Sequence, residues 1–258
     1  MDPKYGERYR DLFDRHWWWR ARTEFIVGIL RRLQPPGGWP TILDIGCGDG
    51  LFFHRLREFG EVEGVEPFAE LVRPDNPDRN RIYTCTFDER FRPSKLYSLI
   101  LMLDVLEHLE NPAGALRHAL DLLAPDGRFV VTVPAFEFLW TNHDVLNHHF
   151  IRYTRSSFRD LAQQAGFQIF QERYMYHWTF FAKLGVRLYE RLLRPKPEPA
   201  SVPPDWVNTP LYWLSRIEQK TVTWASVPFG SSLMVIGGQD RRSSTSDDKS
   251  ALIPSSTS

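Results

Sequence analysis

The feature that most constrains this fold is a short apolar segment that runs directly into a glycine-rich turn. Residues 41–45 read Thr-Ile-Leu-Asp-Ile, and residues 46–50 read Gly-Cys-Gly-Asp-Gly. In open α/β sheets, ligands bind at the carboxyl ends of the strands, and glycine lets the backbone approach them closely. Segment 51–59 is predicted to be a helix, and a helix N-terminus favours an anionic group. The sequence therefore predicts a ligand site at the end of the 41–45 strand.

Apolar runs of strand length alternate with helical patterns along the rest of the chain. Strands are expected at 41–45, 62–65, 81–86, 96–103, 128–133, 167–173 and 231–236, with a turn at 125–127. Helical segments are expected at 4–33, 51–59, 112–123, 154–166 and 211–224. Within the first of them, the apolar helical pattern is expected to start at Thr23 or in the segment before it. This alternation predicts an α/β fold with a parallel sheet and right-handed crossovers. We expect an N-terminal helical cap at 1–40, a main domain at 41–238 with an aromatic insertion at about 174–220, and a polar, disordered tail at 239–258.

Composition excludes several classes of protein. Lys plus Arg and Asp plus Glu number 32 each, and this balance argues against a protein that holds nucleic acid by phosphate neutralisation. The only cysteines, Cys47 and Cys85, cannot form a disulfide framework. The N-terminal residues are charged and no apolar window reaches spanning length, so we expect neither a signal peptide nor a transmembrane helix. These features predict a soluble protein of the cytoplasm.

The spacing of the turn favours one type of cofactor over another. A dinucleotide site has the pattern G-x-G-x-x-G, whereas this turn reads G-x-G-x-G, and Asp44 precedes its first glycine by two residues. A carboxylate there fits the ammonium group of an amino-acid ligand better than a pyrophosphate. Glu66, at the end of the second strand, is placed to accept both hydroxyls of a ribose. A nicotinamide dehydrogenase is therefore the less favoured interpretation.

A third motif completes a family resemblance. Residues 104–109 read Asp-Val-Leu-Glu-His-Leu after the predicted strand 96–103. Together with the glycine turn and Glu66, this segment resembles class I S-adenosylmethionine-dependent methyltransferases, in particular the small-molecule group that includes ubiquinone-biosynthesis O-methyltransferases. The resemblance runs from about His16 to Phe170. It implies a doubly wound, seven-stranded Rossmann-like sheet whose last strand is antiparallel, with capping helices and S-adenosyl-L-methionine as cofactor.

The resemblance also implies which residues bind that cofactor. Asp44, Gly46 and Gly48 would line its methionine part, and Glu66 its ribose. Thr86 and Phe87 would border the adenine, and Leu103 would pack on the adenosine. Arg22 would meet the carboxylate, with Arg20 as the alternative. The third strand departs from the common pattern, because Asp88 stands where many relatives have a Gly-Asp pair.

A histidine-rich segment at 143–154 follows the fifth strand, where substrate-facing residues are expected. Its imidazoles and carboxylate suit a general base for a hydroxyl acceptor, loop-stabilising hydrogen bonds or a metal. We predict that His143 and His148 act as bases, with His108 third, and that no metal is bound.

Two aromatic segments leave alternatives open. Trp17, Trp18 and Trp19 suit either core packing or a lid over the cofactor. Segment 174–194 is aromatic and then basic, which suits either a substrate-capping helix or contact with a membrane surface. The predicted function is methyl transfer, by O-methylation, to a small-molecule or lipid-linked acceptor. The alternative is a non-catalytic module that binds S-adenosylmethionine.

Overall fold

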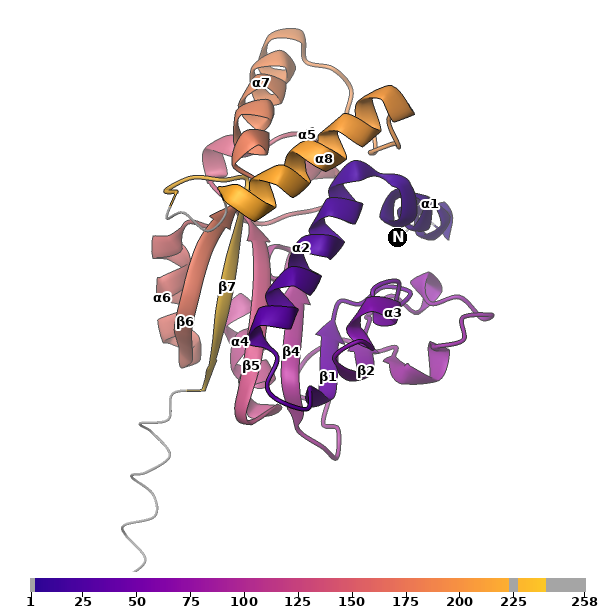
Figure 1. Ribbon diagram of the computed structural model, residues 1–258, viewed down its shortest axis with the longest axis vertical. Coiled ribbons are helices and arrows are strands. Elements are labelled where there is room, and N and C mark those ends of the chain that lie inside the picture. The colour runs from indigo at the N-terminus through magenta and orange to yellow at the C-terminus, as the bar shows by residue number, and fades with distance from the viewer. Residues whose placement is uncertain (1–2, 223–226, 240–258) are drawn as a thin grey trace, which may run out of the picture.

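The protein is built on one seven-stranded sheet. The computed structural model describes residues 3–222 and 227–239, and the strand order is β3-β2-β1-β4-β5-β7-β6 (Figure 1). The strands are β1 (Trp39–Ile45), β2 (Gly60–Val65), β3 (Ile82–Tyr83), β4 (Tyr97–Leu103), β5 (Leu123–Pro134), β6 (Phe167–Met175) and β7 (Ser232–Gln239). β7 runs antiparallel to β5 and β6, and the other pairings are parallel. The expected doubly wound sheet with an antiparallel last strand is confirmed.

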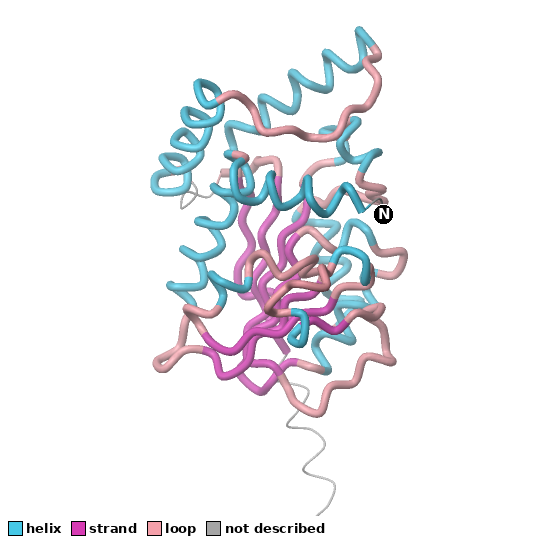
Figure 2. Tube along the Cα trace, turned by 90° about the vertical axis from the view of Figure 1, so that its right-hand side faces the viewer, coloured by secondary structure: helices cyan, strands magenta, loops and turns pink. Residues whose placement is uncertain are grey.

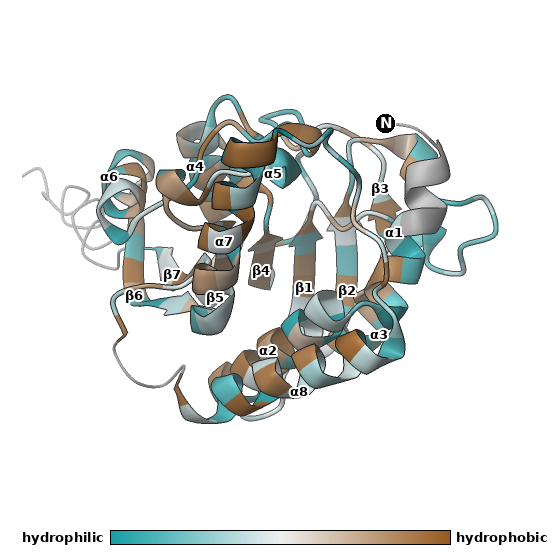
Figure 3. Cartoon of the chain, turned by 90° about the horizontal axis from the view of Figure 1, so that it is seen from above, coloured by the Kyte–Doolittle hydropathy of each residue, from teal (hydrophilic) through white to brown (hydrophobic). Residues whose placement is uncertain are grey.

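Helices cover both faces of the sheet, as Figures 2 and 3 show. The helices are α1 (Pro3–Arg15), α2 (Trp17–Leu33), α3 (Phe53–Leu56), α4 (Pro112–Asp121), α5 (Asn142–Leu146), α6 (Arg155–Ala165), α7 (His177–Leu193) and α8 (Asp205–Thr221). α2 packs on one face and carries α8 on its outer side, whereas α4 and α6 cover the other face. α7 rises above the carboxyl ends of the strands (Figure 1).

Each face of the sheet has its own hydrophobic core. On the α4 and α6 side, Phe129 and Phe158 are fully buried. On the α2 and α3 side, Ile26, Leu30 and Phe53 have at most 1% of their surface exposed to solvent. Two packed layers of this kind fix the sheet rigidly, so the strand ends can position side chains accurately.

The N-terminal segment forms two helices instead of the single expected one. α1 ends at Arg15, and α2 begins at Trp17 because His16 caps it, accepting a hydrogen bond at Nδ1 from the Trp18 N–H at 3.1 Å. The apolar helix therefore starts in the segment before Thr23, the second of the two expected starts, and Thr23 lies inside it. Imidazole is an uncommon cap, so the sequence carried no standard signal for this boundary.

Several other boundaries differ from expectation. The 51–59 helix shrinks to the single turn of α3, and the third strand shortens to the two residues of β3. The 125–127 turn lies inside β5 as an irregularity, with Asp126 at φ 65°. α8 begins six residues before the expected 211 and continues through Pro210. Residue 224 and the predicted tail beyond 239 lie outside the described residues.

The best-signalled helix formed as expected. Thr154 caps α6 by accepting from the Ser157 N–H at 3.1 Å, and the Ser157 hydroxyl reaches back to the Thr154 N–H. Gly166 ends the helix in a left-handed conformation, with φ 73°. This reciprocal capping fixes where the loop after β5 ends and the helix begins.

Candidate active site

The glycine turn lies at the point where the sheet reverses its winding. β1 pairs with β2 on one side and β4 on the other, so the carboxyl end of β1 lies at the switch point of the sheet, where open α/β folds bind ligands in a crevice. Gly46 has φ 74°, and a Cβ on it would approach Val105 Cγ2 to 2.7 Å. Gly48 has φ 57°, and a Cβ there would meet nothing within 4 Å. The turn therefore packs tightly at its base and leaves open space at its tip.

Glu66 directly follows β2, and its side chain links the backbone of the glycine turn to that of residue 68. Its Oε2 accepts a hydrogen bond from the Gly48 N–H at 2.9 Å, and its Oε1 accepts from the Phe68 N–H at 3.0 Å. The side chain is buried, and desolvation raises its pKa. Each carboxylate oxygen has further lone pairs, so the pinned group is suited to accept two hydroxyl hydrogens from a diol.

Asp44 is a second buried carboxyl group in the same crevice. Its pKa is raised to about 7, first by desolvation and further by Glu66, against an opposing effect from Arg22. A buried carboxylate with a raised pKa is stabilised when a cation arrives beside it. Asp44 is therefore suited to an ammonium group on a ligand.

Arg22 reaches the site from α2 and pairs with Asp104 at the end of β4. The Nη2–Oδ2 distance is 2.7 Å, and this ion pair keeps the pKa of Arg22 raised despite burial. Asp104 has a positive φ of 59° and also accepts from the Thr132 hydroxyl at 3.1 Å. Arg20 instead stacks on the Tyr212 ring of α8 at 4.5 Å, so Arg22 is the arginine placed at the site.

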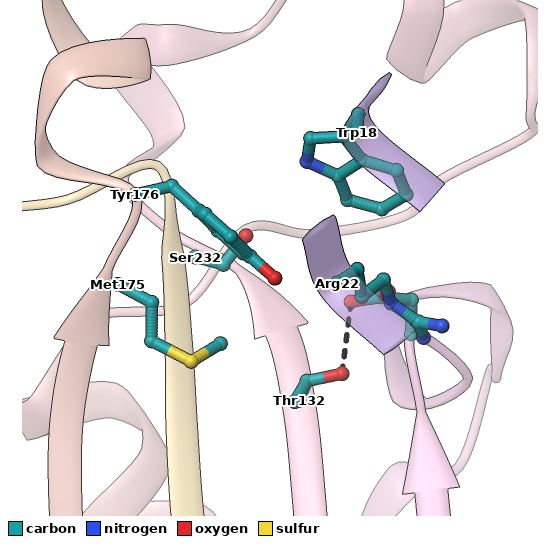
Figure 4. A pocket seen from close by; sticks show the side chains of 7 residues that line it. Trp18, Arg22, Thr132, Met175, Tyr176 and Ser232 are labelled. Atoms are coloured by element: carbon teal, nitrogen blue, oxygen red, sulfur yellow. Dashed lines mark hydrogen bonds and ion pairs between the residues drawn. The ribbon is translucent and has the colours of Figure 1, made fainter. Parts of the chain in front are cut away.

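A narrow pocket opens beside this ion pair (Figure 4). Its lining consists of Trp18, Arg22, Asp104, Thr132, Met175, Tyr176 and Ser232. In the described part of the chain, the buried Tyr176 hydroxyl has no hydrogen-bond partner. Tyr176 also adopts a positive φ of 59°. An unpaired buried hydroxyl is costly in a folded protein, and this pocket has no room for a water molecule that could satisfy it.

Three residues that line this pocket were not predicted from the sequence. Met175, Tyr176 and Ser232 come from β6 and β7, whose spatial order is reversed relative to the chain. The aromatic density around residue 176 was visible, but no sequence pattern placed its hydroxyl beside Arg22.

The two N-terminal helices close over the glycine turn. Asp49 forms an ion pair with Arg10 of α1 and accepts from the Arg73 N–H at 3.1 Å and the Asn76 amide at 2.6 Å. Within the tryptophan triplet, Trp18 lines the pocket, whereas Trp17 packs on Trp178. Trp17 therefore fits the packing interpretation, and the lid over the cofactor stays a prediction for Trp18.

The remaining predicted cofactor residues lie just beyond β3 and at the end of β4. Thr86 is exposed beyond β3. Phe87 is half-buried and packs on His118 and Phe91, with ring centroids 5.0 and 5.8 Å away. Leu103 is half-buried at the end of β4, against the α2 core. Asp88 is held by Arg90, which lowers its pKa to about 2.

A cluster of ionisable side chains lies beyond the end of β4. Glu107, His108 and His149 each place one nitrogen or oxygen within 4.8 Å of the others, a donor set that also suits a divalent cation. Glu107 is buried and its Oε2 has no hydrogen-bond partner in the described chain, so its pKa is raised by desolvation and by Asp104. Desolvation, together with His149, lowers the pKa of His108 to about 4.

His149 is oriented by a buried carboxylate. Its Nδ1 lies 2.8 Å from Asp144 Oδ1, and Arg152 holds the same carboxylate through two hydrogen bonds of 2.9 and 2.8 Å. Burial would raise the pKa of Asp144, but the hydrogen bonds from His149 and Arg152 hold it well below its usual range. The sequence pattern included His149 in the histidine-rich segment but not among the candidate bases.

The two leading candidate bases lie at the rim of this cluster. His143 is on α5, with its ring centroid 6.2 Å from that of His149. Desolvation and Lys183 lower its pKa to about 4, although part of its side chain is exposed. His148 is exposed and has φ 55°. Lys183 of α7 was read from sequence as part of a basic face, yet burial and Arg152 lower its pKa to about 8.

Comparisons with known proteins agree with this geometry. A family model described as a methyltransferase domain matches residues 17–172. Ubiquinone biosynthesis O-methyltransferases are similar to parts of the chain. One from Bradyrhizobium diazoefficiens is 31% identical over 40% of this chain and 43% of its own length. One from Rickettsia felis is 25% identical over 51% of this chain and 61% of its own length. The chain thus matches less than two thirds of these relatives.

Solved structures share the fold at low sequence identity. A putative methyltransferase from Haloferax volcanii, solved with the Trm112 methyltransferase activator, gives a TM-score of 0.57 at 18% identity and covers 92% of this chain and 95% of its own. A SAM-dependent methyltransferase from Thermotoga maritima gives 0.56 at 17% identity, with 92% and 97% covered. A phosphoethanolamine N-methyltransferase from Haemonchus contortus, solved with S-adenosyl-L-methionine, gives 0.51 at 14% identity, with 83% and 52% covered.

The residues present fit the cofactor of that family. The site combines open space at Gly48, a carboxylate at Glu66 held by backbone hydrogen bonds, and a buried carboxyl at Asp44 that a cationic ligand group would stabilise. The family model spans more than half of the chain, and solved SAM-dependent methyltransferases share its fold. The chain therefore belongs to the class I S-adenosylmethionine-dependent methyltransferase family.

Proposed function

We propose that this chain catalyses methyl transfer from S-adenosyl-L-methionine to a hydroxyl group of a small-molecule or lipid-linked acceptor. The observation that carries the proposal is the joining of Asp44, Glu66 and Arg22 around one crevice at the switch point of the sheet. The cofactor supplies a sulfonium methyl group that is already reactive. The protein then mainly has to align the two reactants and exclude water.

Each cofactor residue has a role that follows from its chemistry. Glu66 accepts the ribose hydroxyls while its backbone partners keep it in place. Asp44 balances the ammonium group, and Arg22 meets the carboxylate, with Asp104 orienting the guanidinium. Gly46 and Gly48 let the backbone lie close to the methionine part, and Thr86, Phe87 and Leu103 border the adenosine.

A hydroxyl acceptor also has to lose its proton. Neutral imidazoles suit this step, and the lowered pKa values keep His108 and His143 neutral near pH 7. We propose His143 and His148 as the leading bases and His108 as the third candidate. To them we add His149, because Asp144 orients its ring.

The surroundings favour an apolar acceptor. Phe136, Phe138 and Phe180 form an aromatic cluster next to the histidine loop, with ring centroids 5.2 to 5.8 Å apart. The partial relatives are named as ubiquinone biosynthesis O-methyltransferases, enzymes named for a pathway to a lipidic quinone. None of the helices in the described chain has the length and apolar character to span a bilayer. We propose a cytoplasmic protein that reaches a lipid-linked acceptor from the membrane surface.

The decisive experiment is calorimetric titration with S-adenosylhomocysteine, with NAD as the ligand control. We expect micromolar binding, and Glu66→Ala should lower the affinity at least about tenfold because it removes hydrogen bonds to a charged group. Glu61→Ala, an exposed carboxylate on the same strand, is the matched control and should bind normally. Binding of NAD instead, or no binding by folded protein, would refute the cofactor assignment.

A second experiment separates an enzyme from a non-catalytic binding module. With a panel of quinol, phenol and glycolipid acceptors, replacing the proton-accepting imidazole should lower kcat by about 10²-fold or more and leave the cofactor affinity unchanged. His143→Ala with His148→Ala is compared with His149→Ala and His108→Ala. Unchanged turnover in the first double variant would remove both residues from the candidates. Cofactor binding without turnover on every acceptor would support the binding module.

A further inference from the structure

The buried side chains of α8 are all polar, whereas several of its large apolar side chains are exposed. Trp206, Pro210, Trp213 and Ile217 follow one another at helical spacing and all face solvent. Trp206 is 80% exposed, Trp213 57% and Ile217 58%. A surface helix of a soluble protein normally has the opposite arrangement.

Polar side chains on the inward side of α8 form hydrogen bonds that would be lost if the helix rotated about its axis. Asn208 accepts from the Trp17 N–H at 2.8 Å and donates to the Arg15 carbonyl at 2.8 Å. Gln219 donates to the Ala21 carbonyl at 2.9 Å, and Glu218 accepts from the first two N–H groups of α7 at 3.0 and 2.8 Å. These hydrogen bonds fix the rotation of α8 about its axis, so its exposed apolar side chains stay on the solvent side.

α7 carries a second exposed apolar surface in its second half. From residue 185 to residue 194, every side chain except Glu190 is exposed. Leu188, Leu192 and Leu193 are 58, 71 and 67% exposed. Figure 1 shows this half of α7 above the rest of the molecule, with the start of α8 at a similar height. We call the exposed side chains of residues 186–194, together with Trp206 at the start of α8, the apical face.

Basic side chains accompany these apolar ones. Residues 184–204 contain four basic and two acidic residues, in a chain that carries 32 of each overall. Arg191, Arg194 and Lys196 are exposed, whereas Glu190 is engaged by the Asn142 N–H at 3.0 Å. Tryptophan, leucine and arginine side chains on one exposed face are the composition of helices that lie in the headgroup region of a membrane.

We propose that the apical face docks on the surface of a bilayer that contains anionic phospholipid. Apolar side chains enter the boundary between headgroups and acyl chains, and the arginines contact lipid phosphates. A projecting helix end suits insertion into a soft lipid surface. A second copy of this chain would have to offer a complementary hollow, and an excess of positive charge would face itself across such an interface.

Docking in this way would bring the histidine loop to the lipid. α7 is tied to that loop by the Asn142–Glu190 hydrogen bond and by Arg187, which donates to the Trp140 carbonyl at 2.9 Å. Phe138 and Phe150, on the same loop, are 49 and 60% exposed. This part of the inference deepens the proposed function, because it brings an acceptor dissolved in the bilayer next to the candidate bases.

The test is flotation of the full chain with vesicles of phosphatidylcholine, with and without phosphatidylglycerol. The wild-type protein should float with the anionic vesicles and detach at high salt. Arg191→Gln and Arg194→Gln should each lower the partition coefficient about fivefold, because each removes one charge near the surface. The triple variant Leu192→Ser, Leu193→Ser, Trp206→Ser should abolish flotation. Leu96→Ser is the matched control and should float normally, because this exposed leucine precedes the amino end of the central strand β4, opposite the strand ends below α7.

Two results would overturn the proposal. The first is that the wild-type protein fails to float, or that the triple and arginine variants float as well as wild type. The second is a concentration-dependent dimer, seen by light scattering and lost in the triple variant, without vesicle binding. Titration with S-adenosylhomocysteine accompanies each variant. Unchanged binding shows that the variant is folded, and it separates failure of the docking surface from failure of the methyltransferase assignment.

Discussion

At the residue scale, the site depends on carboxyl groups that are buried before any ligand arrives. Asp44 and Glu66 both have raised pKa values, chiefly because water has been excluded from them. Burying a carboxylate without a counter-charge destabilises the folded protein, and a bound cation removes that penalty. Such groups lower the stability of the unliganded protein and raise its affinity for a cationic ligand.

Asp44→Asn should therefore change both pH dependence and stability. The pKa of Asp44 is about 7 in the folded protein and lies near 4 when unfolded, so its contribution to stability falls as pH rises from about 4 to 7. The asparagine variant should lose that slope and gain on the order of 1–2 kcal/mol in unfolding free energy at pH 8 without ligand. Urea unfolding at several pH values measures this gain.

The same variant should bind S-adenosylhomocysteine more weakly. In the wild-type protein the affinity should increase between about pH 5 and pH 8 as Asp44 ionises, and the variant should lack this part of the increase. Parallel pH profiles for the two proteins would contradict the role of Asp44 as the partner of the ammonium group.

At the element scale, one asparagine joins three helices. Asn208 of α8 satisfies the Arg15 carbonyl at the end of α1 and the Trp17 N–H at the start of α2. This junction sets the angle at which α2 delivers Trp18 and Arg22 to the pocket. The elements that carry cofactor residues are thus positioned by a helix that lies outside them.

Asn208→Ala should lower the unfolding free energy by about 1–2 kcal/mol, because it removes the partners of a partly buried N–H and a partly buried carbonyl. Thr209→Ala, at the neighbouring exposed position, is the matched control and should stay within about 0.5 kcal/mol of wild type. Chemical denaturation measures both. Equal stability of the two variants would show that the junction contributes nothing.

At the scale of the whole molecule, the site is bounded by α1, α2, the Tyr176 position between β6 and α7, and several strand ends that are far apart in sequence. A ligand that contacts all of them adds further links between these distant parts of the chain. Binding to the folded state alone stabilises the entire domain.

S-adenosylhomocysteine at a hundredfold excess over its dissociation constant should stabilise the protein by about 2.7 kcal/mol. For a domain of this size, the midpoint of thermal unfolding should rise by about 5–10 °C. Differential scanning fluorimetry measures the shift. Glu66→Ala at the same ligand concentration should show a much smaller one, and an equal shift would place the ligand elsewhere.

The sequence by itself determined the class of fold and the centre of the site. Strand-helix alternation, the 46–50 turn and the position of Glu66 are local patterns, because backbone geometry and strand ends impose them within a few residues. The capped helix α6 was predictable for the same reason. Boundaries at His16, α3 and Pro210 were not, because tertiary packing decided them against weak or misleading local signals.

Only the tertiary structure decided how distant segments meet. The reversed order of β6 and β7 brings Tyr176 and Ser232 to Arg22, and the folding of the loop after β5 places His149 between His108 and Asp144. The choice of Arg22 over Arg20 depends on which face of α2 meets α8. These contacts join residues across long sequence separations, and no periodicity or motif within one segment records which partner a side chain will find.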